Sequence, residues 1–154
     1  MSKKMREQID KIKNWKQFLN ENQYENYTTS VIALFFNNKI LILQRGNTAP
    51  WMPNKWSLVG GVVDDGENEL ETIKREVKEE ISLSPKNIEF VKKIKTNDTG
   101  DIAFFIGNLD SDKIILDYEN QAYTFIDEKN LDDFDYVPYI YDFIKITLAN
   151  GPRN

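Results

Sequence analysis

The stretch REVKEEISL, residues 75–83, carries three glutamates within about one and a half turns of a predicted helix: Glu76, Glu79 and Glu80. The apolar side chains of the same helix form a stripe about 80° wide on a helical wheel: Leu70, Ile73, Val77 and Ile81. The glutamates lie beside this stripe and not opposite it. Like-charged pairs at this spacing destabilise an isolated helix by about 0.2–0.5 kcal/mol each, and more where water is partly excluded. A hard divalent cation, which prefers oxygen ligands, would offset this repulsion.

A second interpretation of the same segment is a solvated helix face crossed by ion pairs. Arg75 lies four residues from both Glu71 and Glu79, a spacing that allows such pairs. The context favours a cation site, because Gly60-Gly61 comes just upstream and the preceding loop, residues 46–56, is rich in aromatic and turn-forming residues.

The two ends of this helix differ in how regular they are. Asn68, followed three residues later by Glu71, is typical of a capping box at the start of a helix. Pro85 prevents the helix from continuing. Ser82 stands where a left-handed residue, usually glycine, would follow, and serine there costs roughly 1 kcal/mol. Either Ser82 carries that strain, or the helix ends in another way.

The rest of the chain predicts a mixed α+β fold. Two β-branched and aliphatic runs, residues 29–36 and 39–45, flank Asn37-Asn38 and predict a hairpin. Helical spacing of apolar residues predicts amphipathic helices at 3–20 and 139–149. Further strands are predicted in four segments: residues 57–63, 88–95, 102–109 and 121–127. The order of these elements lacks the strand–helix–strand alternation of a Rossmann fold.

The composition excludes several kinds of chemistry. The 154 residues include no cysteine and no histidine, so thiol nucleophiles, histidine-based triads and Cys- or His-ligated metals are ruled out. Acid, base and ligand roles fall to Asp, Glu, Lys or Tyr. A net charge of −5 without a long basic run argues against a duplex nucleic acid partner. Neither a signal peptide nor a membrane span is predicted, so we expect a cytoplasmic protein.

Residues 61–83 resemble the Nudix box, G-x5-E-x7-R-E-U-x-E-E-x-G-U, in which U is a bulky aliphatic residue. All fixed positions match except the second glycine, which is Ser82. Three more segments are similar to parts of that family: the hairpin at 29–45, WSLVGGVVDDGE at 56–67, and ENQAYTFID at 119–127. The resemblance covers roughly residues 28–149, a fixed-spacing match of high specificity.

The resemblance implies an α+β fold, a Nudix-like α/β/α sandwich with a mixed β-sheet, to which the N-terminal amphipathic helix predicted from apolar spacing is added outside the resemblance. We therefore divide the chain into the N-terminal helix and its connector, residues 1–27, and a Nudix hydrolase domain, residues 28–154. The implied reaction is hydrolysis of a diphosphate linkage in a nucleoside diphosphate-X compound, with a (deoxy)nucleoside triphosphate as the leading substrate. ADP-ribose or another nucleotide-sugar is an alternative substrate. The alternative to an enzyme is a catalytically silent module that binds a nucleotide.

The resemblance also assigns residues to roles, with Mg²⁺ or Mn²⁺ as cofactor. It implies four metal ligands: Glu76, Glu79, Glu80 and the carbonyl of Gly61. Arg75 and Glu67 would support the helix and orient Glu76. The general base would be Glu79 or a glutamate from another loop, for which Glu119 is the candidate.

The substrate-binding candidates each have a second interpretation. Arg45 would bind a phosphate or stay solvated, and Trp51 would stack on a base or hold its loop against the core. Asp135 and Tyr136 would read a purine edge or belong to a polar loop. The expected partner is a nucleotide, and the apolar stripe of the N-terminal helix suggests a homodimer or a cap on the domain.

Overall fold

The computed structural model describes residues 3–4, 27–96 and 100–152. Its helices and strands, in chain order, are β1 (Thr28–Phe36), β2 (Lys39–Arg45), β3 (Trp56–Ser57), β4 (Val59–Val62), α2 (Glu69–Ile81), β5 (Lys86–Lys95), β6 (Asp101–Asn108), β7 (Asn120–Ile126), the 3₁₀ turn η2 (Leu131–Asp133) and α3 (Ile140–Asn150). The helix predicted over residues 3–20 lies outside the described residues except for Lys3 and Lys4, so that prediction is untested. In the part of the chain that is described, no helix is both long enough and apolar enough to cross a membrane.

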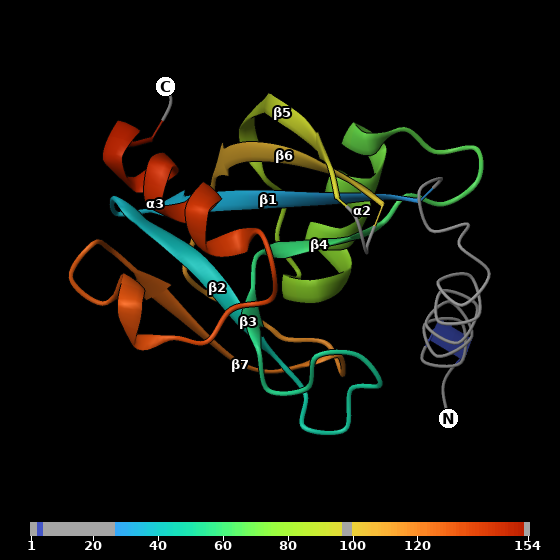
Figure 1. Ribbon diagram of the computed structural model, residues 1–154, viewed down its shortest axis with the longest axis horizontal. Coiled ribbons are helices and arrows are strands. Elements are labelled where there is room, and N and C mark those ends of the chain that lie inside the picture. Colours follow the sequence, from blue (N-terminus) through green and yellow to red (C-terminus); the bar gives the residue numbers. More distant parts are fainter. Residues whose placement is uncertain (1–2, 5–26, 97–99, 153–154) are drawn as a thin grey trace.

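Strand β1 lies at the centre of a seven-stranded mixed sheet (Figure 1). It runs parallel to β6 along almost its whole length, from Thr28 opposite Asp101 to Phe35 opposite Asn108. On its other side the first half of β1 pairs with β4 and its last residues pair with β2, both antiparallel. Strand β2 then runs obliquely away from β1 and pairs with β3 and β7 (Figure 1). Strand β5 forms the far edge, antiparallel to β6.

The predicted hairpin between β1 and β2 is confirmed. Phe36 pairs with Lys39, and the two residues between them, Asn37 and Asn38, have φ angles of 50° and 63°. A two-residue turn with both φ angles positive matches the right-handed twist of the flanking strands, and asparagine tolerates this conformation better than most residues do.

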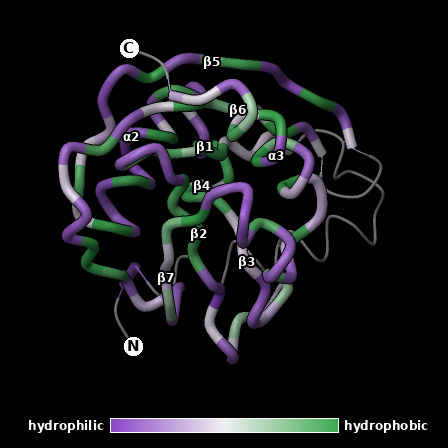
Figure 2. The backbone as a smooth tube through the Cα atoms, turned by 90° about the vertical axis from the view of Figure 1, so that its left-hand side faces the viewer, coloured by the Kyte–Doolittle hydropathy of each residue, from purple (hydrophilic) through white to green (hydrophobic). Residues whose placement is uncertain are grey.

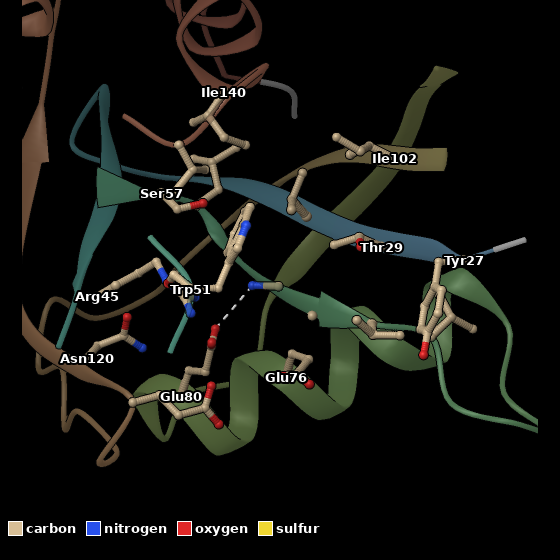
Figure 3. A pocket seen from close by; sticks show the side chains of 18 of the residues that line it. Tyr27, Thr29, Arg45, Trp51, Ser57, Glu76, Glu80, Ile102, Asn120 and Ile140 are labelled. Atoms are coloured by element: carbon tan, nitrogen blue, oxygen red, sulfur yellow. Dashed lines mark hydrogen bonds between the residues drawn. The ribbon is translucent and has the colours of Figure 1, made fainter. Parts of the chain in front are cut away.

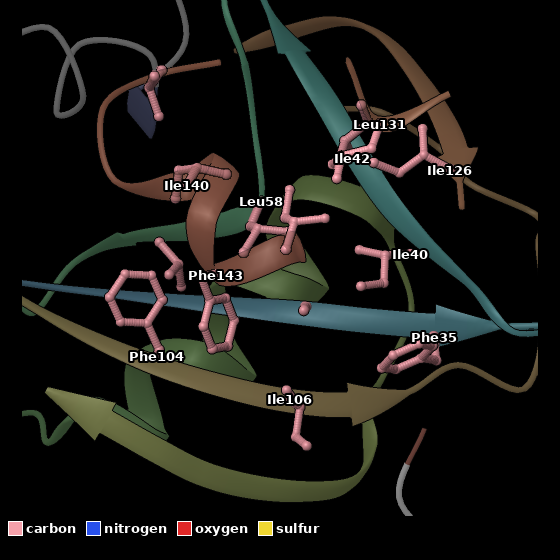
Figure 4. Packing of buried hydrophobic residues seen from close by; sticks show 14 of the residues in the cluster. Phe35, Ile40, Ile42, Leu58, Phe104, Ile106, Ile126, Leu131, Ile140 and Phe143 are labelled. Atoms are coloured by element: carbon pink, nitrogen blue, oxygen red, sulfur yellow. The ribbon is translucent and has the colours of Figure 1, made fainter. Parts of the chain in front are cut away.

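Two helices cover the two faces of the sheet, which confirms the α+β class and the α/β/α arrangement. Side chains of β1 alternate between them, with Val31, Ala33 and Phe35 on the α3 side and Ile32 and Leu34 on the α2 side. Figure 4 shows the apolar cluster on the α3 side, in which Phe104 of β6 packs against Phe143 of α3 with ring centroids 4.5 Å apart. Because both faces are covered, the central strands are apolar without alternation, as the hydropathy colouring of β1 and β2 shows (Figure 2).

Helix α2 begins and ends at the residues that the sequence singled out. Asn68 accepts a hydrogen bond from the backbone N–H of Glu71, and Glu71 accepts one from the backbone N–H of Asn68, so the capping box is confirmed. Ser82 adopts the left-handed conformation, with φ 61° and ψ 33°, and its N–H donates to the carbonyl of Lys78. Of the two alternatives for this helix end, the structure therefore shows the one in which Ser82 carries the strain.

Replacing Ser82 with glycine is expected to raise the free energy of unfolding by about 1 kcal/mol, because glycine adopts the left-handed conformation without a Cβ penalty. The Ser82 side chain is exposed, so its loss removes no core contact. Urea unfolding measures the change. Ser84→Gly is the matched control, since Ser84 is exposed and its φ is not positive. Equal stabilities of wild type and Ser82→Gly would contradict the strain.

Candidate active site

A cavity of about 350 Å³ opens beside β4, between the glutamate-bearing face of α2 and the start of α3. Residues from β1, β2, β4, α2, β7 and the turn before α3 line it. Its apolar part includes Val31, Leu58, Ile102, Val137 and Ile140. Its polar part collects candidate residues that are far apart in the sequence: Arg45, Gly61, Glu76, Glu80 and Glu119.

The three glutamates of the box differ in their burial. Glu76 and Glu80 expose only 2% and 6% of their surface, whereas the side chain of Glu79 is 31% exposed. Glu80 reaches from α2 to β4, where its Oε2 accepts a hydrogen bond of 3.1 Å from the N–H of Gly60 (Figure 3). Glu76 Oε1 accepts a 2.8 Å hydrogen bond from Arg75 Nη1. The alternative of a solvated helix face therefore fits Glu79 in part but not Glu76 and Glu80.

The Gly-Gly pair of β4 makes room for this arrangement. A Cβ on Gly61 would overlap the carboxylate of Glu76, and a Cβ on Gly60 would overlap the carbonyl oxygen of Ser30 on β1. Glycine at both positions thus allows α2 to approach the sheet with its carboxylates in between.

Arg75 and Glu67 form a bidentate ion pair. Arg75 Nε donates to Glu67 Oε2 at 2.9 Å and Arg75 Nη2 donates to Glu67 Oε1 at 2.8 Å. Glu67 Oε1 also accepts from the Thr72 hydroxyl and from the N–H of Asp64, and these bonds, with the Arg75 pair first among them, lower the pKa of Glu67 to about 2. Because the guanidinium also bonds Glu76 Oε1, the loop before α2 holds Arg75 in the orientation that positions Glu76.

A second group of acids approaches from the start of β7. Glu119 lines the cavity, and its Oε1 is buried without a hydrogen-bond partner among the described residues. Asp117, which the sequence reasoning missed, has a side chain only 8% exposed. Its N–H donates to the carbonyl of Glu80 at 3.2 Å, which fixes this loop against the end of α2. The acidic run Asp117-Tyr118-Glu119 was the available signal, but its spacing matches no motif.

Burial dominates the electrostatics of these carboxyl groups. It raises the pKa of Glu76 to about 8 against the opposing effect of Arg75, and it raises the pKa of Glu80 well above its usual value with Glu76 as the next cause. Burial, with Asp117 next, raises the pKa of Glu119 to about 7. Each acid therefore resists ionisation where it lies, and a nearby cation would reverse that tendency.

The predicted substrate-binding residues separate into two pairs. Arg45 and Trp51 line the cavity and brace each other, since Arg45 Nε donates to the Trp51 carbonyl at 2.9 Å and its Cζ lies 5.2 Å from the centroid of the indole (Figure 3). Asp135 instead extends outward with a 74% exposed side chain and pairs with Lys55. Tyr136 donates its hydroxyl to the Leu131 carbonyl at 2.7 Å. The structure does not bring these last two side chains into the cavity, and their role in binding substrate stays a prediction.

The atoms that could bind a metal in this cavity fit a hard divalent cation that retains part of its water shell. They are all oxygens, and the unpartnered buried Oε1 of Glu119 is an acceptor that a cation or its water would satisfy. Among the residues that the structure describes, no three acidic side chains already stand at metal-ligand spacing. Mg²⁺ commonly uses one or two carboxylates together with waters and substrate phosphates, so a complete protein cage is not required.

Replacing Gly61 with alanine is expected to lower kcat at least tenfold, because the added Cβ overlaps the Glu76 carboxylate and displaces it. The overpacking should also reduce the free energy of unfolding by about 1–2 kcal/mol. Gly60→Ala is the matched comparison: its Cβ meets backbone, which cannot swing away, so its loss of stability should be the larger. Initial rates and urea unfolding of both variants check this. A Gly61→Ala variant with the kcat of wild type would contradict the prediction that activity depends on the position of the Glu76 carboxylate beside Gly61.

Comparison with known proteins agrees with this geometry. A family model described as NUDIX domain matches residues 26–138. No curated protein sequence matches the chain. Among solved structures, a hydrolase of the NUDIX family from Clostridium perfringens has a TM-score of 0.66 at 15% identity, over 80% of this chain and 97% of that one. A MutT protein from Methanosarcina mazei Go1 has a TM-score of 0.62 at 20% identity, over 80% and 92%.

A further solved structure, an ADP-ribose pyrophosphatase from Streptococcus suis, has a TM-score of 0.60 at 21% identity, over 80% of this chain and 90% of that one. At these identities the structural likeness establishes the fold and not the substrate. The family model covers more than half of the chain, and it includes both β4 and the whole of α2. The chain belongs to the Nudix hydrolase family.

Proposed function

We propose that this protein is a Mg²⁺-dependent pyrophosphohydrolase that cleaves a nucleoside diphosphate-X compound, with a (deoxy)nucleoside triphosphate as the leading substrate. The observation that carries the proposal is the convergence of Glu76, Glu80 and Glu119 on one cavity that also contains the guanidinium of Arg45. Buried carboxylates without enough cations nearby are costly, and a polyphosphate brought in with divalent cations offsets that cost.

In the proposed reaction a water oxygen attacks one phosphorus and the bond from that phosphorus to its bridging oxygen breaks. When bound, Mg²⁺ or Mn²⁺ would neutralise charge on the phosphates and acidify the attacking water. Glu76, Glu79 and Glu80, with the carbonyl of Gly61, would hold the cation, while Arg75 and Glu67 keep Glu76 in place. Arg45 would contact phosphate oxygens, and the water's proton would pass to a carboxylate.

Glu119 is the favoured general base. Burial raises its pKa to about 7, which is close to the pH at which a base works best, and its Oε1 is free of hydrogen bonds within the described residues. Glu79 is the alternative base, although it already contacts Arg75 Nη1 at 3.4 Å. One experiment distinguishes the two assignments. Glu119→Gln should remove the acid limb of the pH–rate profile if Glu119 is the base, and should leave that limb in place if Glu79 is the base.

The size of the cavity favours a substrate with one nucleoside unit. At about 350 Å³ it lies near the lower end of ligand pockets, and Trp51 provides an aromatic face braced by Arg45. ADP-ribose carries a second ribose and therefore needs more room than a nucleoside triphosphate. It stays the alternative substrate, because a protein named ADP-ribose pyrophosphatase is almost as similar in structure as the MutT protein.

A substrate panel tests the proposal. The full chain is incubated with Mg²⁺ and nucleoside triphosphates, oxidised deoxynucleoside triphosphates, ADP-ribose, dinucleoside polyphosphates and NADH, and the nucleotide products are separated and quantified by anion-exchange chromatography, since hydrolysis of ADP-ribose or NADH releases neither phosphate nor pyrophosphate. Turnover of triphosphates above ADP-ribose is the expected result. Tight binding of one compound without turnover of any would replace the enzyme with a nucleotide-binding module.

Three further parts of the proposal concern the whole chain. We propose a boundary between an N-terminal segment, residues 1–27, and the catalytic domain, residues 28–154, and a cytoplasmic location. We also propose a homodimer, for which sedimentation velocity of the full chain is the test: a mass near that of the 18.1 kDa monomer at all concentrations would refute it.

A further inference from the structure

The ammonium group of Lys4 lies at the edge of the carboxylate cluster. Its Nζ is 3.3 Å from Asp117 Oδ2 and 3.7 Å from Glu79 Oε2, and it lies 5.7 Å from the centroid of the Tyr118 ring. The two carboxylates come from elements far apart in the sequence, the end of α2 and the approach to β7. Nothing in the Nudix box or in the proposed reaction uses this lysine.

The two carboxylate oxygens of Asp117 have different partners: one accepts hydrogen bonds from the start of β7, and the other accepts one from Lys4. Oδ1 accepts hydrogen bonds from the N–H of Glu119 at 3.1 Å and from Asn120 Nδ2 at 3.4 Å, and so orients the start of β7. Oδ2 accepts from Lys4 at 3.3 Å. A cation at this position therefore influences both candidate bases. It pairs with Glu79 directly, and it pairs with Asp117, which in turn accepts a hydrogen bond from the backbone of Glu119.

We propose that Lys4 is a tethered cation that occupies the position between Glu79 and Asp117, and that a divalent cation bound through Glu79 displaces it. The inference rests on the metal site of the proposed function. Before the metal binds, the ammonium lies between the two carboxylates and offsets their mutual repulsion. Once the metal binds, Lys4 stands beside a like charge and is repelled.

The geometry allows this exchange. The Lys4 side chain is 34% exposed and its flexible stem lets the ammonium move into water, in contrast to Arg75, which the bidentate pair with Glu67 holds in place. Displacing the Lys4 ammonium loses its ion pairs with Glu79 and Asp117, and the loss of two such partly exposed pairs lowers the affinity for the displacing ion by roughly tenfold. Lys4 should therefore weaken divalent binding by about that factor.

Binding of Mn²⁺ to the full chain without substrate tests the inference, measured by electron paramagnetic resonance of the free ion. Lys4→Met is expected to bind Mn²⁺ roughly tenfold more tightly than wild type, and Lys4→Arg, which keeps the charge, within about twofold of it. Lys3→Met is the matched control, because it removes the same charge from the adjacent, exposed side chain. Its dissociation constant should stay within about twofold of wild type.

The possible results separate this inference from the proposed function. Equal Mn²⁺ affinity in wild type and Lys4→Met, or weaker binding in Lys4→Met, overturns the inference and leaves the metal site in place. Absence of Mn²⁺ binding in wild type and both Lys4 variants overturns the metal site and the inference together. An equal tightening in Lys3→Met and Lys4→Met would show a general charge effect and would also overturn it.

A second measurement uses the wild-type protein and so does not depend on how the variants fold. The chain is treated with an amine-acylating reagent with and without saturating Mg²⁺, and labelling at Lys4 and Lys3 is quantified by mass spectrometry. Displacement of Lys4 should raise its labelling severalfold relative to Lys3. An unchanged ratio, with Mg²⁺ binding demonstrated, would overturn the exchange.

Discussion

Glu80→Gln is expected to lower kcat by about 10³-fold while leaving the fold intact. Glu80 is almost fully buried, and its Oε2 accepts the N–H of Gly60, a role that a glutamine amide oxygen can fill with the same shape. What glutamine cannot supply is the negative charge, and the loss of one preorganised charged group at a phosphoryl-transfer site costs 10²–10³-fold or more. Burial opposes ionisation of Glu80, so the metal-free variant should be no less stable than wild type.

Initial rates at saturating Mg²⁺ and substrate, with urea unfolding in a chelator, measure the two halves of this expectation. Glu69→Gln is the control on the same helix: Glu69 pairs with Lys93 at the surface, away from the cavity, and its replacement should change kcat by less than about twofold. If Glu80→Gln keeps more than a tenth of the wild-type rate, Glu80 is not a metal ligand.

Arg75→Met is expected to lower both activity and stability. Methionine keeps the aliphatic volume but removes the guanidinium from Glu67, Glu76 and Glu79, so Glu76 loses its hydrogen-bonded partner inside a buried site. The loss of these charge-assisted hydrogen bonds, above all the bidentate pair with Glu67, should reduce the free energy of unfolding by about 2–3 kcal/mol at pH 7. The freed Glu76 side chain no longer has a fixed position, which should lower kcat about 10²-fold.

The pH dependence of stability distinguishes this explanation from a loss of packing. The pKa of Glu67 is about 2 in the folded protein, below its ordinary value near 4.5. The ion pair therefore contributes its stability above about pH 4.5, and this contribution is lost as the pH falls toward 2. The difference in free energy of unfolding between wild type and Arg75→Met should shrink between pH 5 and pH 3. A difference that stays constant over that range would point to packing instead.

Much of the fold was predictable because local signals agree with the final structure. The capping residues Asn68 and Glu71 mark the start of α2, and the Asn37-Asn38 turn determines the first hairpin. Both could be predicted from side-chain chemistry alone. Continuous apolar runs in β1 and β6 indicated strands but not their partners. Their parallel pairing joins segments on either side of the box, and nothing in the local sequence specifies it.

The candidate site was most predictable where a fixed spacing encodes geometry. The spacing of the box places Glu76 and Glu80 on the face of α2 that meets Gly60-Gly61. Lys4 and Asp117 meet only through the tertiary fold, so no spacing rule could have linked them. Asp135 lies in the predicted loop, but whether a loop side chain points inward or outward depends on its backbone, and this one points outward.

The parallel pairing of β1 with β6 has a consequence for how the protein folds. Val31 lies opposite Phe104, so the strand pair closes a loop that contains the whole box, residues 61–83. Closing a loop of this length is an early entropic cost of folding, and chains rich in such contacts fold slowly. The carboxyl groups can meet only after that closure, when Glu119 also arrives with β7. Their mutual repulsion should therefore act on how fast the native protein unfolds and have little influence on the search for the fold.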